Sequence, residues 1–353
     1  MKVLYFATYY IDHYVRQDVI IDALEKIKGI ELIKCVVNKK SPLRYFQAIG
    51  KFIFTSKKDV DVIFVGFRGH EVLPLLRLLT RKPIIFDAFL SLYDTLCFER
   101  KKFSPNSLAG KFLFWFDRHN LKIADHVILD TKAHANYFRD VFRVPEKKLT
   151  FLYVGSDQNI FYPREKKEIS NKFVVFYYST FRPLHGVECV VKAAKLLSND
   201  KDIIFRIIGR GPEKNKIIKM SVKLELNNIN FVDWLELSKL SEEMANADIC
   251  LGGHFSVLAK AKRVIPGKVF QFLAMKKAVI VGNGEANKEI FKNRDNCLMV
   301  NGSDSEDLKR AILELKNDKI LRDKISEKGH QTFLSVQNGI KESLEKKINE
   351  TIT

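Results

Sequence analysis

The sequence predicts an α/β protein made of two parallel-sheet halves that face a cleft. Three observations lead to this fold class. Short apolar runs of strand length alternate with amphipathic segments of helix length, which is the pattern of parallel sheets covered by helices. The pattern stops at Pro163 and a charged patch, and then starts again. The chain has 353 residues, more than one hydrophobic core usually supports, so two domains are expected.

The expected strands are near-continuous apolar runs, as is typical of strands that are buried on both faces. In the first half they cover residues 3–6, 30–37, 62–65, 83–86 and 126–129, with helical stretches such as 15–27 and 71–79 between them. In the second half, strands are expected at 173–178, 203–208, 229–232, 248–251 and 278–281, with helices at 187–197, 212–224, 238–245 and 268–275. The chain from position 306 to the end is expected to be helical and highly charged. We therefore expect domains at 1–165 and 166–335 and a final helix at 336–353.

The charge of the chain limits the classes of partner. It carries 60 Lys and Arg against 42 Asp and Glu, a formal net charge of +18. The excess is spread along the chain. Residues 1–165 contain 27 basic and 18 acidic residues, and residues 166–353 contain 33 basic and 24 acidic residues. A basic surface attracts anions such as the phosphates of metabolites and acidic lipid headgroups. Because no nucleic-acid recognition motif accompanies the charge, we expect no nucleic-acid partner.

Cysteine usage and hydropathy indicate the compartment. The five cysteines lie far apart and form no Cys-x-x-Cys pair, which argues against a disulfide framework or a structural zinc site. No run approaches the ~18 to 20 apolar residues of a membrane span, and the start of the chain does not look like a signal peptide. We therefore expect a cytoplasmic location.

The first strand-to-helix turn of the second half is suited to an anion. Arg182 and His185 stand where a strand end meets a helix N-terminus, and Gly186 completes the turn. Free backbone N–H groups, the positive end of the helix and a guanidinium that can grip phosphate favour a negative ligand there. An ordinary turn with a solvent-facing arginine is the alternative.

The next turns carry glycines and an aromatic residue. Gly209 and Gly211 allow close backbone approach, and Trp234 ends the following strand. Their spacing is not the Gly-x-Gly-x-x-Gly of a dinucleotide site, so that site is excluded. Trp234 is suited to stack on a base, and a tryptophan packed between domains is an equally good reading.

The third turn gives the strongest signal. Three cations and Pro266-Gly267 lead into an apolar helix that carries Lys268 in its first turn. A cation there opposes the helix dipole by a few tenths of a kcal/mol or more. An anion bound between Lys268 and the helix N-terminus would remove this unfavourable interaction. The alternative is a lysine that is simply exposed to solvent. A fourth flexible turn, Gly282-Asn283, follows the next strand at the same sheet edge.

Taken in order, these motifs resemble the donor half of the family-four glycosyltransferases of GT-B fold. The resemblance rests on segments 180–188, 208–212, 264–274 and 278–280, and in the first half on 86–95, 124–131 and 154–157. It covers nearly the whole chain. It implies two Rossmann-like domains, the first binding the acceptor and the second the nucleotide-sugar donor, with the final helix crossing back onto the first.

The resemblance also implies a retaining sugar transfer, with the nucleotide sugar as substrate and no cofactor. It implies donor-phosphate contacts from Arg182, Lys268 and Gly186. It implies nucleotide or sugar contacts from Gly209, Gly211, Trp234, His254, Phe255, Pro266, Gln271, Gly282, Asn283 and Glu289. Asp87, at the end of a buried strand, stands where relatives place a polar residue near the reacting sugar, and is the candidate catalytic residue. Capping of the next turn is the alternative role for Asp87.

The chain departs from the family at two acidic positions. Many members carry two glutamates separated by seven residues near the third turn, whereas this chain has Arg263 and Gln271 in that region. Gln271 can hydrogen-bond a ribose hydroxyl but supplies no charge. Two alternatives to a transferase therefore stay open: a non-catalytic nucleotide-sugar-binding or scaffold protein, and a GT-B sugar-nucleotide epimerase. The epimerase needs paired acid and base groups, and the sequence supplies no convincing pair.

No metal site is expected. The Asp59-Val60-Asp61 triplet precedes a strand and would lie at the wrong edge of the sheet, and the eight histidines show no ligand spacing. We therefore expect metal independence, for a transferase that the resemblance implies to be of the hexosyl type.

Two segments of the first half mix aromatic and basic residues. They cover 43–58 and 101–116. Such segments can lie on an anionic bilayer, while burial against the sheet explains the aromatic residues equally well. Membrane contact would suit a lipid-linked sugar acceptor. The acceptor is therefore expected to be a glycan or a lipid-linked sugar, and peripheral contact with the inner face of a membrane stays open.

Overall fold

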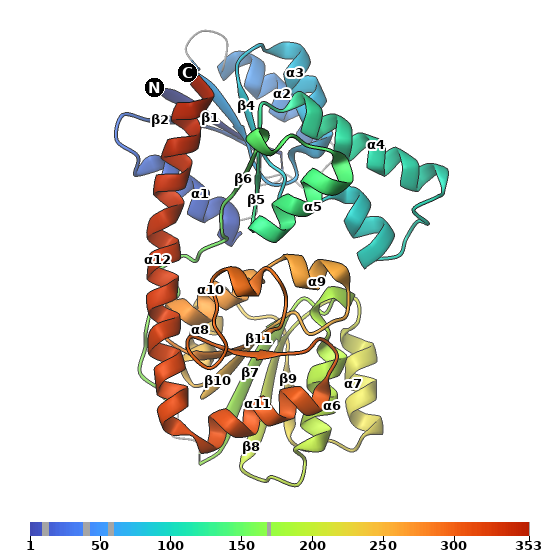
Figure 1. Cartoon of the computed structure of the whole chain (residues 1–353), viewed down its shortest axis with the longest axis vertical. Coiled ribbons are helices and arrows are strands. Elements are labelled where there is room, and N and C mark those ends of the chain that lie inside the picture. The colour runs from blue at the N-terminus through green and yellow to red at the C-terminus, as the bar shows by residue number, and fades with distance from the viewer. Residues whose placement is uncertain (9–13, 38–42, 56–59, 168–170, 353) are drawn as a thin grey trace. The chain divides into compact units, whose positions relative to one another are not determined.

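The computed structural model describes residues 1–8, 14–37, 43–55, 60–167 and 171–352. The chain divides into two compact units, Met1–Val154 with Gln337–Thr353, and Gly155–Val336. Each unit is built on a six-stranded sheet in which every neighbouring pair of strands is parallel (Figure 1). The expected α/β fold class with two parallel sheets is confirmed, while the expected domain boundaries and cleft stay predictions.

The first sheet has the order β2-β1-β3-β4-β5-β6. Its strands are β1 (Lys2–Ala7), β2 (Glu31–Val36), β3 (Val62–Val65), β4 (Ile84–Asp87), β5 (His126–Leu129) and β6 (Leu149–Phe151). The helices of this unit are α1 (Val15–Glu25), α2 (Arg44–Thr55), α3 (Leu73–Leu79), α4 (Leu108–Ile123) and α5 (Lys132–Phe142). Short helical turns are η1 (Gly69–Glu71), η2 (Asp94–Glu99) and η3 (Glu146–Lys148).

Alternate residues of these strands feed two separate cores, because successive side chains of a strand point to opposite faces. On one face Phe6 and Phe86 pack in a cluster with side chains of α2, α3, α4 and α5. On the other face Tyr5 and Phe64 pack with α1 and with the last turns of α12 (Lys319–Ile352). The unit is therefore a sheet between two helical layers.

The second sheet has the order β12-β11-β10-β7-β8-β9. Its strands are β7 (Phe173–Ser179), β8 (Ile203–Gly209), β9 (Ile229–Val232), β10 (Ile249–Gly253), β11 (Ala278–Gly282) and β12 (Leu298–Val300). Its helices are α6 (Val187–Leu196), α7 (Lys214–Lys223), α8 (Leu237–Ala245), α9 (Ala259–Arg263), α10 (Gly267–Ala274) and α11 (Ser305–Asn317), with short turns η4 (Pro183–His185) and η5 (Asn287–Glu289).

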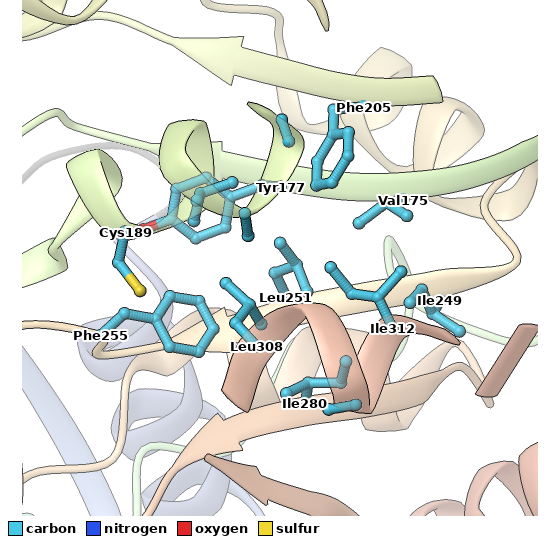
Figure 2. Close-up of a cluster of buried hydrophobic side chains, with 14 of the residues drawn as sticks. Val175, Tyr177, Cys189, Phe205, Ile249, Leu251, Phe255, Ile280, Leu308 and Ile312 are labelled. Atoms are coloured by element: carbon cyan, nitrogen blue, oxygen red, sulfur yellow. The ribbon is translucent and has the colours of Figure 1, made fainter. Parts of the chain in front are cut away.

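The core on one face of this sheet joins β7, β8, β10 and β11 to α6 and α11 (Figure 2). Tyr177, Phe205 and Leu251 come from the strands, and Leu308 and Ile312 from α11. On the other face Phe176 contacts Phe272 of α10, with ring centroids 5.9 Å apart. The strands are thus held rigidly between helices, and their carboxyl ends present the connecting turns.

Side-chain caps define where several helices begin. Ser107, Thr131 and Asp304 each accept a hydrogen bond from the backbone N–H three residues later, at the starts of α4, α5 and α11. The end of the chain is helical as expected, in two helices that Asp318 separates, and the second of them begins at Lys319 and not at position 336. Within the part of the chain that the structure describes, no helix combines the length and apolar character needed to span a membrane.

Candidate functional site

The turns at the carboxyl ends of β7 and β8 lie against each other and require glycine. Gly209 and Gly211 have φ values of +152° and +151°, and a Cβ on either would lie within 2 Å of a carbonyl oxygen of Ser179 or Thr180. A side chain at these positions would force the two turns apart. The glycines therefore act by shaping this edge of the sheet.

Two further glycines let the remaining turns approach the same place. A Cβ on Gly186 would lie 2.4 Å from the carbonyl carbon of Phe255, and one on Gly282 would lie 2.3 Å from the carbonyl oxygen of His254. Phe255 also donates its backbone N–H to the carbonyl of His185 at 3.2 Å. The turns after β7, β10 and β11 thus converge on one edge.

Lys268 lies at the centre of this convergence and is only 7% exposed. Its Nζ donates to the Tyr178 carbonyl at 2.6 Å and lies 4.2 Å from the centroid of the Tyr177 ring. Burial lowers the pKa of Lys268 from 10.5 to about 7. The cation has ring and carbonyl partners, but no ion pair with a carboxylate is present among the described residues.

Two histidines stand beside this lysine. The rings of His185 and His254 are stacked with centroids 5.2 Å apart. His185 Nδ1 and Ser179 Oγ are 2.6 Å apart, whereas the buried Nδ1 of His254 has no hydrogen-bond partner within the described ranges. Burial first, and then the nearby Lys268, hold the pKa of both histidines well below the ordinary value. This environment favours the neutral form of both imidazoles.

The electrostatic surroundings are positive. Arg182 adds to the repulsion that lowers the pKa of His185, and Lys260 does the same for His254. Arg182 is half-buried, its backbone carbonyl accepts a hydrogen bond from the His185 N–H, and its side chain makes no ion pair or hydrogen bond with the described residues. Among the described residues, no carboxylate pairs with Lys268 or with the side chain of Arg182, so this edge is suited to a phosphate-bearing ligand.

Aromatic side chains and the amide side chain of Gln271 lie next to the cations. The Tyr178 hydroxyl donates to Oε1 of Gln271, a side chain only 2% exposed. The Tyr178 ring also contacts Trp234, with centroids 6.1 Å apart, and the Arg210 guanidinium lies 5.5 Å from the centroid of Trp234. Gln271 and Trp234 are therefore linked through Tyr178 to the lysine, within one unit.

The other expected ligand-binding residues have different surroundings. The Phe255 ring is fully buried in the hydrophobic core, as Figure 2 shows. Pro266 is buried and precedes α10. Asn283 is exposed and bonds to Asn301, and Glu289 ends η5. A side-chain contact of Phe255 with ligand is therefore disfavoured by its packing, while the roles of the others stay predictions.

Asp87, the candidate catalytic residue, is fully buried at the end of β4 in the first unit. Both its carboxylate oxygens accept hydrogen bonds from Nε of Arg16 at 3.0 Å, and Oδ1 also accepts one from Nη2 at 2.7 Å. Arg16 donates further to the carbonyls of Leu129 and Leu152. The carboxylate is thus part of an ion pair that joins α1 to the sheet, and its catalytic role stays a prediction.

Several of these groups were missed from the sequence. Arg16 precedes the apolar residues Val19 and Ile20 of α1, and only its place near that buried face hinted at an internal partner. From the sequence, Tyr177 and Tyr178 are only the last residues of an expected apolar strand. Their contacts with Lys268 depend on the approach of α10, which strand patterning does not reveal.

The described residues contain no group of three or more His, Cys, Asp or Glu that could hold a metal ion. Of the Asp59-Val60-Asp61 triplet, Asp59 lies outside the described residues. Asp61 accepts a hydrogen bond from the backbone of Lys2 at the start of β1.

Comparisons with known proteins agree with this geometry. Residues 159–332 match the family model described as glycosyl transferases group 1. The uncharacterized glycosyltransferase MJ1069 of Methanocaldococcus jannaschii is 24% identical, over 69% of this chain and 61% of its own length. The lipopolysaccharide core biosynthesis glycosyltransferase LpsE of Rhizobium meliloti is 20% identical, over 60% and 59%. The chain thus spans about three fifths of the length of the curated relatives that it matches.

Solved structures share the fold over nearly the whole chain. Anabaena HepE in complex with UDP superposes with a TM-score of 0.73 at 15% identity, covering 98% of this chain and 100% of that one. Sucrose-phosphate synthase from Thermosynechococcus elongatus gives a TM-score of 0.76 at 14% identity, covering 99% and 98%. The chain therefore shares the GT-B fold of these solved structures, and residues 159–332 of it match the group 1 glycosyltransferases.

Proposed function

We propose that the protein is a retaining, metal-independent glycosyltransferase that moves a sugar from a nucleotide-sugar donor to a glycan or lipid-linked acceptor. The observation that carries the proposal is the buried cation Lys268, which has His185, His254 and Arg182 around it and no carboxylate partner among the described residues. A nucleoside diphosphate brings the missing negative charge. Structures of Anabaena HepE hold UDP and UDP-glucose, which supports this class of ligand here.

The cations would also assist the chemical step. In a transfer from a nucleotide sugar, negative charge develops on the leaving diphosphate as its bond to the sugar breaks. Lys268 and Arg182 would stabilise that charge in a site with a low local dielectric, where such stabilisation is strongest. The guanidinium of Arg182 can bond two phosphate oxygens at once, whereas Lys268 acts as a point charge. Trp234, beside Tyr178 and Arg210, would line the pocket of the base.

Two substitutions test the donor site. Lys268→Ala and Arg182→Ala should each weaken binding of UDP, GDP or ADP by about 1 to 3 kcal/mol, the value of a lost charge-assisted contact. Binding of the matching nucleoside should change much less. The first measurement is a thermal-shift screen of these nucleotides and their sugars, because a ligand that binds the folded state raises its stability. Lys277→Ala is the matched control. Lys277 precedes β11 at the opposite, amino-terminal edge of the strands, is half-buried, and donates hydrogen bonds to the carbonyls of Ala245 and Ala247. Equal losses for nucleoside and diphosphate would contradict the assigned roles.

A non-catalytic nucleotide-sugar-binding protein is the second candidate, and Gln271 is the observation that favours it. Its amide stands where a carboxylate is common in the family, and Tyr178 already occupies its oxygen. Incubation of a bound nucleotide sugar with a panel of glycan and lipid-linked acceptors distinguishes the candidates. Transfer with the donor's anomeric configuration kept, seen by NMR and unchanged by EDTA, supports the retaining enzyme. Tight donor binding without transfer supports the second candidate.

We also propose that the first unit contacts an anionic membrane, where a lipid-linked acceptor would be found. Ten exposed large apolar residues lie between positions 43 and 115, on or beside the helices α2, α3 and α4, which cover one face of the first sheet. On α4, Leu108, Phe112 and Trp115 are 88%, 57% and 56% exposed and share one face with Lys111 and Lys122. Patches that combine apolar rings with cations are suited to the boundary of anionic lipid. The end of the 43–58 segment lies outside the described residues.

Liposome binding tests this surface. Vesicles of phosphatidylglycerol should bind the protein at low salt, and the double variant Phe112→Ser with Trp115→Ser should bind at least tenfold less. Val222→Ser is the matched control, because Val222 is 71% exposed on α7 of the second unit. If wild-type protein ignores these vesicles, the membrane proposal is wrong, while the donor site is unaffected.

A further inference from the structure

Three protonatable groups from three different turns meet at the carboxyl edge of the second sheet. Lys268 comes from the first turn of α10, His185 from η4 and His254 from the residue after β10. The histidine rings are stacked, and Lys268 is a source of the repulsion that each of them feels. Lys268 and His254 are each only 7% exposed, so both lie largely out of contact with water.

The charges that act on this cluster from the described residues are positive. Arg182 adds to the repulsion on His185, and Lys260 adds to the repulsion on His254. The rings of Tyr177 and Tyr178 and the Tyr178 carbonyl face Lys268. No carboxylate contributes to the electrostatic surroundings of the three groups within the described part of the chain.

Such a cluster is not stable with all its protons bound unless negative charge is brought to it. Several positive charges in one buried place repel one another, and each also loses its hydration. The buried Nδ1 of His254 adds a polar atom that has no hydrogen-bond partner in the described ranges. A diphosphate supplies both the missing negative charge and the missing hydrogen-bonding groups.

We propose that Lys268, His185 and His254 form a proton-coupled cradle, which takes up protons from solution when the diphosphate of the donor binds. This inference rests on the proposed function, because it needs the diphosphate at this edge. Lys268 is the main acceptor of the proton, since its pKa of about 7 leaves it largely neutral at pH 8. The histidines supply a smaller uptake as pH falls. Nucleoside diphosphate should therefore bind more tightly at lower pH and be released more readily at higher pH.

Isothermal titration calorimetry with UDP, GDP and ADP at pH 8 measures this uptake directly. The binding heat is compared in Tris and HEPES, whose ionisation enthalpies differ, and the slope gives the number of protons taken up. At pH 8 the terminal phosphate of a nucleotide is fully ionised, because its second pKa is about 6. Wild-type protein should take up about one proton per nucleotide, the change expected when a mostly neutral lysine becomes fully charged. Between pH 7.5 and 8.5 the affinity should fall several-fold, approaching tenfold per proton.

Matched variants assign the proton. Lys268→Met should remove most of the uptake at pH 8, and His254→Gln should reduce the uptake that remains at pH 7. Lys277→Met should leave it unchanged, although burial also lowers the pKa of Lys277, because that lysine lies at the other edge of the sheet.

The outcomes separate this inference from the function on which it rests. Tight binding of a nucleotide with no proton uptake, or with uptake that survives in Lys268→Met, overturns the cradle and leaves the donor site intact. Failure of UDP, GDP and ADP to bind overturns both.

Discussion

Replacing Lys268 with methionine should make the unliganded protein more stable while it removes a contact to the donor. Methionine has nearly the length of lysine and no charge, so it fits a place that is 93% covered and lined by the Tyr177 ring. The wild-type lysine is destabilising because the folded state must hold it neutral or hold a buried charge. The unfolded chain leaves it charged in water.

The structure sets the size of this effect. With a pKa of about 7 in the folded state and 10.5 in the unfolded chain, keeping Lys268 neutral at pH 8 costs about 3 kcal/mol, at about 1.4 kcal/mol per pH unit. The variant loses the Nζ hydrogen bond to the Tyr178 carbonyl, worth about 1 kcal/mol. The net gain is about 2 kcal/mol. At about 2 to 4 °C per kcal/mol, the second unit should melt about 4 to 8 °C higher.

The gain should depend on pH in a defined direction. A folded pKa below the unfolded one means that the unfolded state binds more protons between about pH 7 and 10.5, so the wild type becomes more stable as pH rises through that window. The advantage of Lys268→Met is therefore greatest at pH 7 and below, and it shrinks toward pH 10. Below pH 7 it stays constant, because the lysine is then charged in both states.

Thermal unfolding of the wild type, Lys268→Met and Lys192→Met across pH 6 to 10 checks this reasoning. Lys192 is exposed on α6, so its replacement should change neither the melting temperature nor its pH dependence. The transition to follow is the one that UDP shifts in the wild type. A variant that melts lower than the wild type at pH 7, or whose advantage grows with pH, would refute the account of the buried lysine.

Three further outcomes follow from particular contacts. Gly211→Ala should destabilise the second unit by about 2 kcal/mol or more, because the new Cβ would lie 1.8 Å from the Thr180 carbonyl oxygen. Urea unfolding measures this loss of stability. A loss under about 0.5 kcal/mol would contradict the steric crowding. Arg16→Met should cost the first unit about 3 to 5 kcal/mol in the same assay, because it leaves the buried Asp87 without its partner, and a near-neutral result would mean that the pair is dispensable. All five cysteines are buried, and burial raises the pKa of Cys250 to about 12. A thiol reagent should therefore react with them only after denaturant is added. Rapid labelling of the native protein would contradict the burial of these cysteines.

The central strands of both sheets could be predicted from sequence because they are buried on both faces. Strand β3, Val62–Val65, contains only apolar residues. A short, fully apolar run of this kind is typical of a strand that is buried on both faces. The edge strands β6 and β12 were missed. Each has three residues, and such a length carries no periodic signal. The start of α4 at Ser107 was also missed, although a serine that caps a helix is visible in principle.

The candidate site could be predicted in part for a related reason. Residues that follow predicted strands must lie at the carboxyl edge of a parallel sheet, so Lys268, Gly209 and His254 were assigned to one edge from order alone. Their partners could not be assigned in the same way. Tyr178 meets Lys268 across 90 positions, and Arg16 meets Asp87 across 71. Such pairs depend on how helices dock on the sheet, which single-strand patterns do not encode.

The two units treat a buried cation in opposite ways, and this contrast argues for the location of the ligand. In the first unit, the Arg16 guanidinium is matched by both oxygens of Asp87 and by two carbonyls, so its charge is fully compensated within the fold. In the second unit, the Lys268 ammonium has one carbonyl and the rings of Tyr177 and Tyr178. Both cations are deeply buried, so the difference does not come from exposure. A buried charge without a partner lowers the stability of the folded state. Such a charge is of use to the protein when a ligand of opposite charge pairs with it. Compensation by an anionic ligand, as proposed above, would explain why the destabilising arrangement occurs in the unit that matches the glycosyltransferase family and not in the other.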